Sequence, residues 1–333
     1  MAEAQSAVDG EISEWLGYRS PYEQWKESEG LPTIRGYFVE NLYDLKLTPW
    51  RSSGDGLAVF VNLEGTGGFN DAYVCEIPPG KSLTPHRHVF EETIYILKGH
   101  GATSVWISPE SKQTFEWQEG SYFSVPMNAW HEHFNVSGKE PARYVAMTSA
   151  PRVIDTFNEP DFVFANPYVF RSRFNGEEGY FKQSEPSKQW STNFVADVRE
   201  CRTFGEGFDG GAAATSTVFR MVNNTVKSHV SEWSVGSYKK AHRHGPGAHL
   251  VLLSGTGGDS LVWAKEDRSD MIKCDWQLGS MVIVPSDNCY HQHFNSGTTR
   301  ARYLALRQGD MGLYSPRGGG GEYADRSMKE GGW

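Results

Sequence analysis

Two histidines and a glutamate in the stretch GKSLTPHRHVFEETIYILKG, residues 80–99, could together hold a metal ion. His86 and His88 lie two residues apart, and Glu92 follows four residues after His88. The apolar and β-branched residues 94–97 indicate a strand. Strand positions of equal parity face the same side, so the three side chains can point into one cavity. Two imidazoles and a carboxylate in one cavity suit a first-row transition metal.

A fourth ligand comes from the stretch GSYFSVPMNAWHEHFN, residues 120–135. Pro126 and Asn128 indicate a turn between two strands, and His131 opens the second strand. This second strand-turn-strand unit therefore offers one more imidazole to the same cavity.

Together the two stretches resemble the paired motifs of the cupin superfamily. The first motif is matched by Gly80, His86, His88, Glu92 and Gly99, and the second by Gly120, Pro126, His131 and Asn135. Asn128 replaces the usual turn glycine, a mild departure because asparagine tolerates left-handed backbone angles. The resemblance implies a jelly-roll barrel, the double-stranded β-helix, with His86, His88, Glu92 and His131 as the ligands of one metal ion.

The chain contains a second copy of this module. His86 recurs as His242, an offset of 156 residues (242 − 86), and His131 recurs as His291, an offset of 160 (291 − 131). Offsets that drift by only a few residues indicate two copies of one unit with small loop changes. The chain thus resembles a bicupin over roughly residues 57–310.

We therefore predict an all-β fold with two cupin barrels in tandem and an N-terminal arm containing a short helix. The expected division is an arm at 1–56, a first barrel at 57–150, a connecting segment packed on the barrels at 151–211, a second barrel at 212–310 and a flexible tail at 311–333.

The second copy differs from the first in its ligands. It keeps His242, His244 and His291, but Ala248 stands where the first copy has Glu92. His249 has the wrong parity for the same face unless a bulge redirects it. A three-histidine site of this kind resembles those of the gentisate and salicylate 1,2-dioxygenases, which implies ferrous iron and a hydroxybenzoate substrate.

Other residues are weaker candidates for the sites. His133 and His293 follow a ligand by two positions, and each is either an acid-base or second-layer group near the metal or a histidine bonded to backbone at the barrel mouth. The candidates for a substrate pocket are Tyr95, Trp106, Tyr238 and His249, with ordinary core packing as the alternative for the aromatic residues.

Composition excludes several classes of partner. A formal net charge of −9 and a sequence pI of about 5.7 argue against nucleic acid and anionic membrane as partners. The sequence shows no membrane span and no secretory signal, and its four cysteines lack CxxC spacing, so a cytoplasmic protein with free thiols is expected. The arm and the family resemblance favour a homodimer or higher homo-oligomer.

Three hypotheses for function follow. The first is a non-haem dioxygenase that uses Fe(II) and O2 to cleave a small aromatic or phenolic carboxylate. The alternative is a Mn(II)-dependent lyase, decarboxylase or isomerase at the three-histidine, one-glutamate site of the first barrel. The third is a non-catalytic cupin that binds a small molecule. Both enzymatic hypotheses expect one or two Fe(II) or Mn(II) ions per chain and an anionic substrate.

Overall fold

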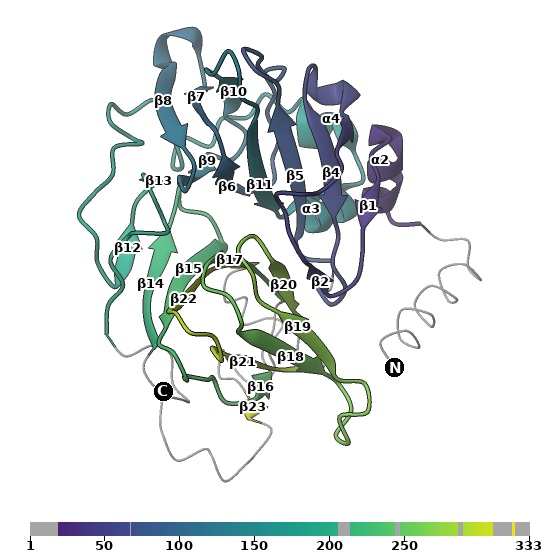
Figure 1. Ribbon diagram of the computed structural model, residues 1–333. Helices are drawn as coiled ribbons and strands as arrows, with labels where there is room; N and C mark the ends of the chain where they lie inside the picture. Colours follow the sequence, from purple (N-terminus) through teal and green to yellow (C-terminus); the bar gives the residue numbers. More distant parts are fainter. Residues whose placement is uncertain are drawn as a thin grey trace.

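The computed structural model describes residues 19–66, 68–205, 214–243, 247–285, 289–308 and 322–323, which form two β-barrels (Figure 1). The predicted all-β fold with a short N-terminal helix is confirmed. Helix α2 (Pro21–Glu29) begins where Ser20 Oγ accepts a hydrogen bond from the Glu23 amide, and it ends at Gly30 in the left-handed conformation. No helix among the described residues is long and apolar enough to cross a membrane.

The first barrel consists of a large sheet and a small sheet. The large sheet has the order β1 (Thr33–Ile34), β4 (Leu57–Val61), β5 (Asp71–Ile77), β11 (Ala142–Thr148), β6 (Glu92–Lys98), β9 (Tyr122–Val125) and β13 (Phe194–Val195), with β3 (Thr48–Pro49) also on β4. The small sheet is β10 (Trp130–Asn135), β7 (His100–Trp106) and β8 (Gln113–Gln118). The helical turns are η1 (Arg51–Ser53) and η2 (Pro109–Ser111).

The second barrel repeats this plan. Its large sheet has the order β12 (Gln189–Ser191), β14 (Ala214–Arg220), β15 (Val226–Trp233), β22 (Ala301–Gln308), β17 (Ala248–Ser254), β20 (Met281–Val284) and β2 (Phe38–Val39). Its small sheet is β19 (Ile272–Asp275), β18 (Asp259–Trp263), β21 (Tyr290–Phe294), β16 (His242–Arg243) and β23 (Glu322–Tyr323).

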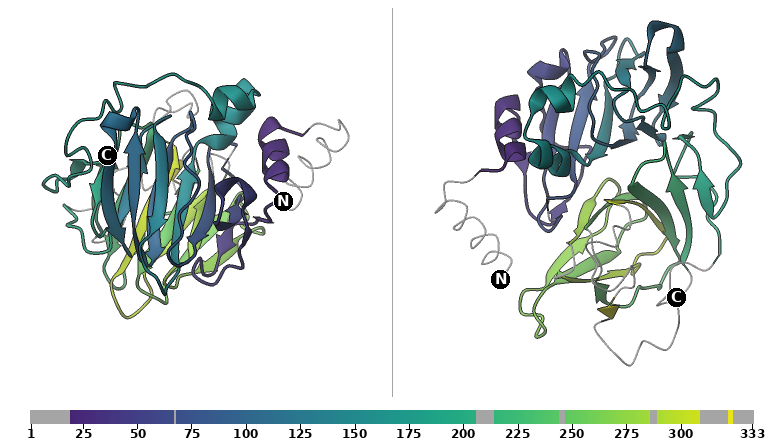
Figure 2. Two further views of the ribbon diagram at one scale, coloured as in Figure 1. Left: turned by 90° about the horizontal axis from the view of Figure 1, so that it is seen from above. Right: turned by 180° about the vertical axis from the view of Figure 1, so that it is seen from behind.

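The two barrels exchange edge strands. Strand β2, from the segment before barrel 1, pairs with β20 of barrel 2, and β13, from the segment between the barrels, pairs with β9 of barrel 1. The segments expected to be an arm and a connection therefore complete both large sheets. The connecting segment also forms α3 (Ala150–Phe157) and α4 (Pro160–Phe164), which lie beside α2 against barrel 1 (Figure 2).

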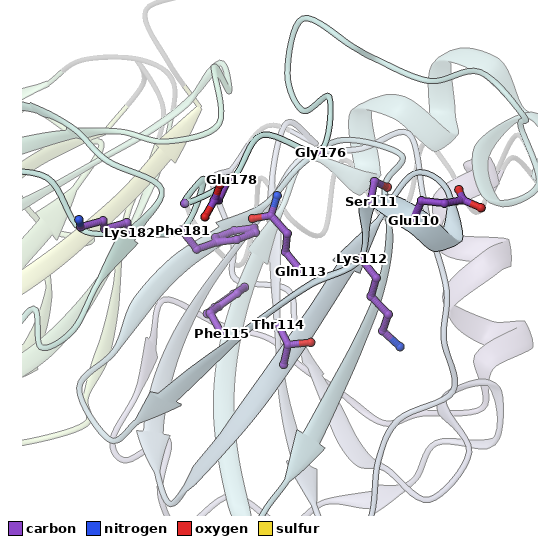
Figure 3. A pocket seen from close by; sticks show the side chains of 11 residues that line it. Glu110, Ser111, Lys112, Gln113, Thr114, Phe115, Gly176, Glu178, Phe181 and Lys182 are labelled. Carbon is purple, nitrogen blue, oxygen red and sulfur yellow. The ribbon is translucent and has the colours of Figure 1, made fainter.

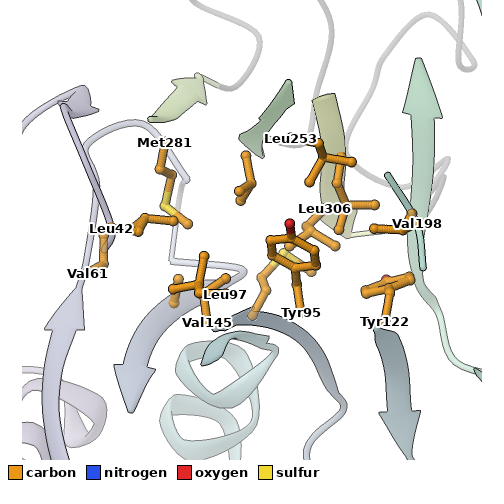
Figure 4. Packing of buried hydrophobic residues seen from close by; sticks show 14 of the residues in the cluster. Leu42, Val61, Tyr95, Leu97, Tyr122, Val145, Val198, Leu253, Met281 and Leu306 are labelled. Atoms are coloured by element: carbon orange, nitrogen blue, oxygen red, sulfur yellow. The ribbon is translucent and has the colours of Figure 1, made fainter. Parts of the chain in front are cut away.

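A shared hydrophobic core lies between the two large sheets (Figure 4). On β6, Tyr95 and Leu97 point into this core, whereas Ile94 and Ile96 point into barrel 1. Strands β6 and β17 are thus buried on both faces, which explains their nearly continuous apolar sequence. The shared core also contains, among others, Leu42, Val61, Tyr122, Val145, Val198, Leu253, Met281 and Leu306.

A buried arginine in each barrel holds the chain that arrives from the edge of the other barrel. Arg143 donates to the carbonyl oxygens of Leu42, Tyr43 and Leu45, which follow β2. Arg302 donates to Val198 O (3.3 Å) and Cys201 O (2.9 Å), which follow β13, and pairs with Glu232 (2.7 Å). The two arginines thereby fasten the strand exchange from both sides.

We predict that Arg302→Met lowers the free energy of unfolding by about 3 kcal/mol, because it removes the charge that the buried carbonyls and Glu232 share. Arg300→Met is the matched control, since Arg300 pairs with the same Glu232 but its side chain is 72% exposed, and we expect a loss below about 1 kcal/mol. Urea unfolding followed by tryptophan fluorescence measures both values. Equal losses in the two variants would contradict this role for Arg302.

Candidate metal centre

Three histidines meet inside barrel 1. Side-chain nitrogens of His86, His88 and His131 all lie within 4.8 Å of one another. The backbones of His86 and His131 form an antiparallel bridge with N–O distances of 3.1 and 2.9 Å. The chain that carries the His86–His88 pair is therefore held directly against β10, which carries His131.

The ring orientation of each histidine is fixed by a backbone carbonyl two residues away in the chain. Nδ1 lies 2.9 Å from Thr84 O in His86, 2.9 Å from Phe90 O in His88 and 3.0 Å from Ala129 O in His131. A carbonyl oxygen can only accept a hydrogen bond, so Nδ1 carries the proton in all three rings. Each Nε2 is then left with a lone pair, which is the form that binds a metal.

Glu92 adds a carboxylate to this group. Its Oε2 lies 3.5 Å from His88 Nε2 and 3.8 Å from His131 Nε2. Burial alone would raise the pKa of Glu92, but His88 and the hydroxyl of Tyr73, which donates to Oε1, lower it to about 2. The Glu92 carboxyl is therefore ionised.

The polar atoms at this point fit a bound cation. Within the described residues, His88 Nε2, His131 Nε2 and Glu92 Oε2 are buried and have no hydrogen-bond partner. Leaving three such atoms unsatisfied in a protein interior is costly. A divalent ion bound by these atoms and by His86 would satisfy them, and imidazole and carboxylate suit both iron and manganese.

His133 lies beside this group and is held by a two-step hydrogen-bond chain. Its Nδ1 is 2.8 Å from Thr103 Oγ1, which accepts from Trp117 Nε1 at 2.9 Å. Side-chain atoms of Glu92, His131 and His133 lie within 4.8 Å of one another. Burial lowers the pKa of His133 to about 3, so the ring is neutral. The ring is bonded to a side-chain hydroxyl and not to backbone, so the acid-base or second-layer role of His133 stays a prediction.

Barrel 2 contains the same hydrogen-bond chain. His293 Nδ1 lies 2.7 Å from Ser260 Oγ, and Trp276 Nε1 donates to that oxygen at 2.9 Å. A serine replaces the threonine of barrel 1, but the arrangement of indole, hydroxyl and imidazole is unchanged.

A stack of cations and aromatic rings lies on the opposite face of the histidine-bearing strands. In barrel 1, Arg87 covers Trp130 (4.9 Å), Trp130 stacks on Trp106 (6.3 Å), and Lys112 covers Trp106 (4.6 Å). Arg87 stands between two candidate ligands and Trp130 directly precedes a third, so this contact ties the two strands together from outside. Barrel 2 repeats the stack with Arg243, Tyr290, Trp263 and Arg268.

The second candidate site is described only in part. The rings of His242 and His291 lie 4.2 Å apart, as do those of His86 and His131, and His242 Nδ1 lies 2.8 Å from Lys240 O. His244 lies outside the described residues. Ala248 pairs with Val284 as Glu92 pairs with Val125, so this part of the site has no carboxylate at the Glu92 position.

The four candidates for a substrate pocket lie away from the candidate metal ligands. Tyr95 is in the shared core, and His249 follows Ala248 with no bulge between them and faces away from the interior of barrel 2. Trp106 is in the outer stack, and Tyr238 is 41% exposed beside Phe294. Strand parity agrees with this for two of them, because Tyr95 has the opposite parity to Glu92 on β6 and His249 the opposite parity to Ala248 on β17.

Tyr73, Thr103 and Trp117 were not predicted as functional residues. Tyr73 is on β5, which has no motif in the sequence. Thr103 and Trp117 had one usable signal: Trp117 recurs as Trp276 at an offset of 159 residues (276 − 117), and both indoles serve the same hydrogen-bond chain.

A surface hollow of about 450 Å³ lies on the outer side of barrel 1 (Figure 3). Its lining comes from η2, β8 and the connecting segment and includes Lys112, which lies between η2 and β8, together with Phe115 and Phe181. None of the candidate ligands lines it, so this hollow is separate from the metal centre.

We predict that His88→Ala abolishes metal binding in barrel 1 and that Tyr73→Phe weakens it by about 10- to 100-fold, because the hydroxyl orients Glu92. Tyr122→Phe is the matched control, since it removes a buried hydroxyl that donates to Ser228 in the shared core. Chelator competition with Mn(II) measures each affinity. Unchanged binding in Tyr73→Phe would remove the orienting role of Tyr73.

Comparison with known proteins agrees with the two-barrel fold. Residues 73–148 match the family model described as Cupin domain. No curated protein sequence matches the chain. A solved structure of a Bacillus subtilis oxalate decarboxylase mutant is similar with a TM-score of 0.52 and 15% identity, over 83% of this chain and 78% of that one. Another structure of that enzyme, from work on its Mn(II) centres, gives 0.52 and 16% over the same shares. Residues 73–148 therefore form a cupin domain, and the chain as a whole has the two-barrel fold called bicupin.

Proposed function

We propose that this protein is a metal-dependent lyase, most simply a decarboxylase, that acts on a small carboxylate with Mn(II) at His86, His88, Glu92 and His131. The observation that carries the proposal is the convergence of imidazole nitrogens and one ionised carboxylate in barrel 1, with every Nδ1 already occupied. The bicupin fold, which Bacillus subtilis oxalate decarboxylase also has, supports this reaction class.

The residues of the site are proposed to have separate roles. Bound Mn(II) would act as a Lewis acid toward the substrate carboxylate. His86 is the one candidate ligand of barrel 1 that is partly exposed, so we propose that the substrate enters from its side. We propose that His133 hydrogen-bonds a substrate at the metal, which its contact with Thr103 and its proximity to Glu92 and His131 support. His293 is proposed to serve the same purpose in barrel 2.

A second candidate function is a dioxygenase that uses Fe(II) and O2 on an aromatic carboxylate. The observation that favours it is Ala248 in the position of Glu92, which leaves a barrel-2 site of His242, His244 and His291 without a carboxylate ligand.

The expected cytoplasmic location and homo-oligomeric state of the protein stay predictions.

A substrate screen under argon and in air separates these functions. The metal-loaded protein is incubated with small mono- and dicarboxylates and with hydroxybenzoates, while CO2, products by NMR and O2 consumption are followed. We expect CO2 release without stoichiometric O2 uptake, lost in His88→Ala and kept in His242→Ala. Ring cleavage with one O2 per turnover, lost in His242→Ala, would establish the dioxygenase instead. Binding without turnover would support the non-catalytic alternative.

A further inference from the structure

The residue before the candidate ligand Glu92 is a buried carboxylate that faces the other barrel. Glu91 has the opposite parity to Glu92, so its side chain points outward while that of Glu92 points toward the candidate histidines. The Glu91 side chain is only 3% exposed. Its two oxygens accept four hydrogen bonds, from Arg173 Nη1 (2.8 Å), Thr225 N and Oγ1 (2.9 Å each) and Val226 N (2.8 Å).

Three of these four donors belong to the hairpin turn of barrel 2 that joins β14 to β15. The turn is closed by a hydrogen bond from Asn224 N to Met221 O at 2.8 Å. Val222 and Asn223 have φ angles of 45° and 55°, the pattern of a two-residue type I′ turn. A positive φ is strained for a β-branched residue such as Val222, and it persists only where the surrounding contacts determine the conformation. One such contact is the hydrogen bond from Val222 N to Asn193 Oδ1 at 2.8 Å.

The same turn also reaches the backbone of Glu92. Asn224 Nδ2 donates to Ser124 Oγ at 2.8 Å, and Ser124 Oγ donates to Glu92 O. Arg173, which pairs with Glu91, also donates to Asn224 Oδ1 at 2.8 Å. One turn of barrel 2 therefore holds the side chain of Glu91 and the carbonyl of Glu92, at the point where β6 begins. We call this set of contacts the clamp.

Barrel 2 has a glycine at the position that corresponds to Glu91. At the offset of 156 residues that relates Glu92 to Ala248 (248 − 92), the preceding residue is Gly247. A Cβ at Gly247 would lie 2.9 Å from Gly65 O, so this position has no room for a carboxylate side chain. The carboxylate of the clamp thus occurs beside the glutamate ligand and is replaced by glycine beside Ala248.

We propose that Glu91 is a positioning residue through which barrel 2 fixes the metal ligand Glu92 of barrel 1. A ligand that must be ordered when the metal binds loses part of its affinity, and a strand that is already held at its first residue avoids this loss. The clamp acts from the outer face of β6, whereas Tyr73 orients the Glu92 carboxylate from inside. This inference rests on the proposed function, because it takes Glu92 as a ligand of Mn(II).

Amide hydrogen exchange of the full-length, metal-free protein tests the clamp itself. In Glu91→Gln one acceptor oxygen becomes an amide nitrogen, so two of the four donors lose their acceptor. We expect the peptide covering β6 to exchange at least about 10-fold faster relative to the peptide covering β5 than it does in the wild type. The β5 peptide is the internal reference, because a loss of global stability accelerates both peptides equally.

Chelator competition with Mn(II) tests the consequence for the metal. We expect Glu91→Gln to bind Mn(II) about 10- to 100-fold more weakly than the wild type. Arg302→Met is the matched control, since it also removes a buried charge between the barrels but contacts the chain after β13, and its affinity should stay within about 3-fold of the wild type. Arg173→Met, whose side chain is 18% exposed, should also weaken Mn(II) binding and replaces Glu91→Gln if that variant does not fold.

The outcomes separate a failure of the clamp from a failure of the metal site. The inference is overturned if the ratio of β6 to β5 exchange is the same in Glu91→Gln as in the wild type, or if Glu91→Gln binds Mn(II) as tightly as the wild type. It is also overturned if Arg302→Met weakens Mn(II) binding as much as Glu91→Gln, since the effect would then be one of stability alone. Wild-type Mn(II) binding that His88→Ala leaves unchanged would overturn the proposed function, and this inference with it.

Discussion

Burial of the large sheets on both faces is the constraint on which the rest of this structure depends. The side chains of β6, and likewise those of β17, point alternately into the interior of their own barrel and into the core shared by the two barrels. The residues packed in the shared core are apolar, whereas Glu92 stands at an inward position beside the candidate histidine ligands. The reciprocal exchange of β2 and β13 fixes this arrangement, because each large sheet is completed by a segment adjoining the other barrel.

The small sheets hold several imidazoles at fixed separation. Backbone carbonyls set the rings of His86, His88 and His131 from inside, and the stack of Arg87 on Trp130 joins the same strands from outside. Each cation–π contact contributes only about 0.5–1 kcal/mol at a partly exposed site. The stack nevertheless recurs in both barrels with different residues, as does the chain of indole, hydroxyl and imidazole. The duplicated scaffold thus has the same supports in both barrels, although Ala248 stands in barrel 2 where barrel 1 has Glu92.

The sequence predicted the fold class and brought the four candidate ligands of barrel 1 into one group, because motif spacing and strand parity are local properties. It also placed Ala248 opposite Glu92 by counting, and the strand register agrees. It could not show that the segments around Phe38 and Phe194 exchange between barrels, since two-residue strands leave no periodic pattern. Tyr95 is a wrong pocket candidate on parity alone, since it faces away from Glu92 on β6, but only the tertiary structure reveals that the second barrel covers this outer face.

The most direct test of the central claim is diffraction from crystals of the Mn(II)-loaded protein at a wavelength where manganese scatters anomalously. The account predicts an anomalous peak inside barrel 1 that is bonded to Nε2 of His86, His88 and His131 and to the carboxylate of Glu92. A protein that binds manganese elsewhere, with no peak between these four side chains, would contradict it.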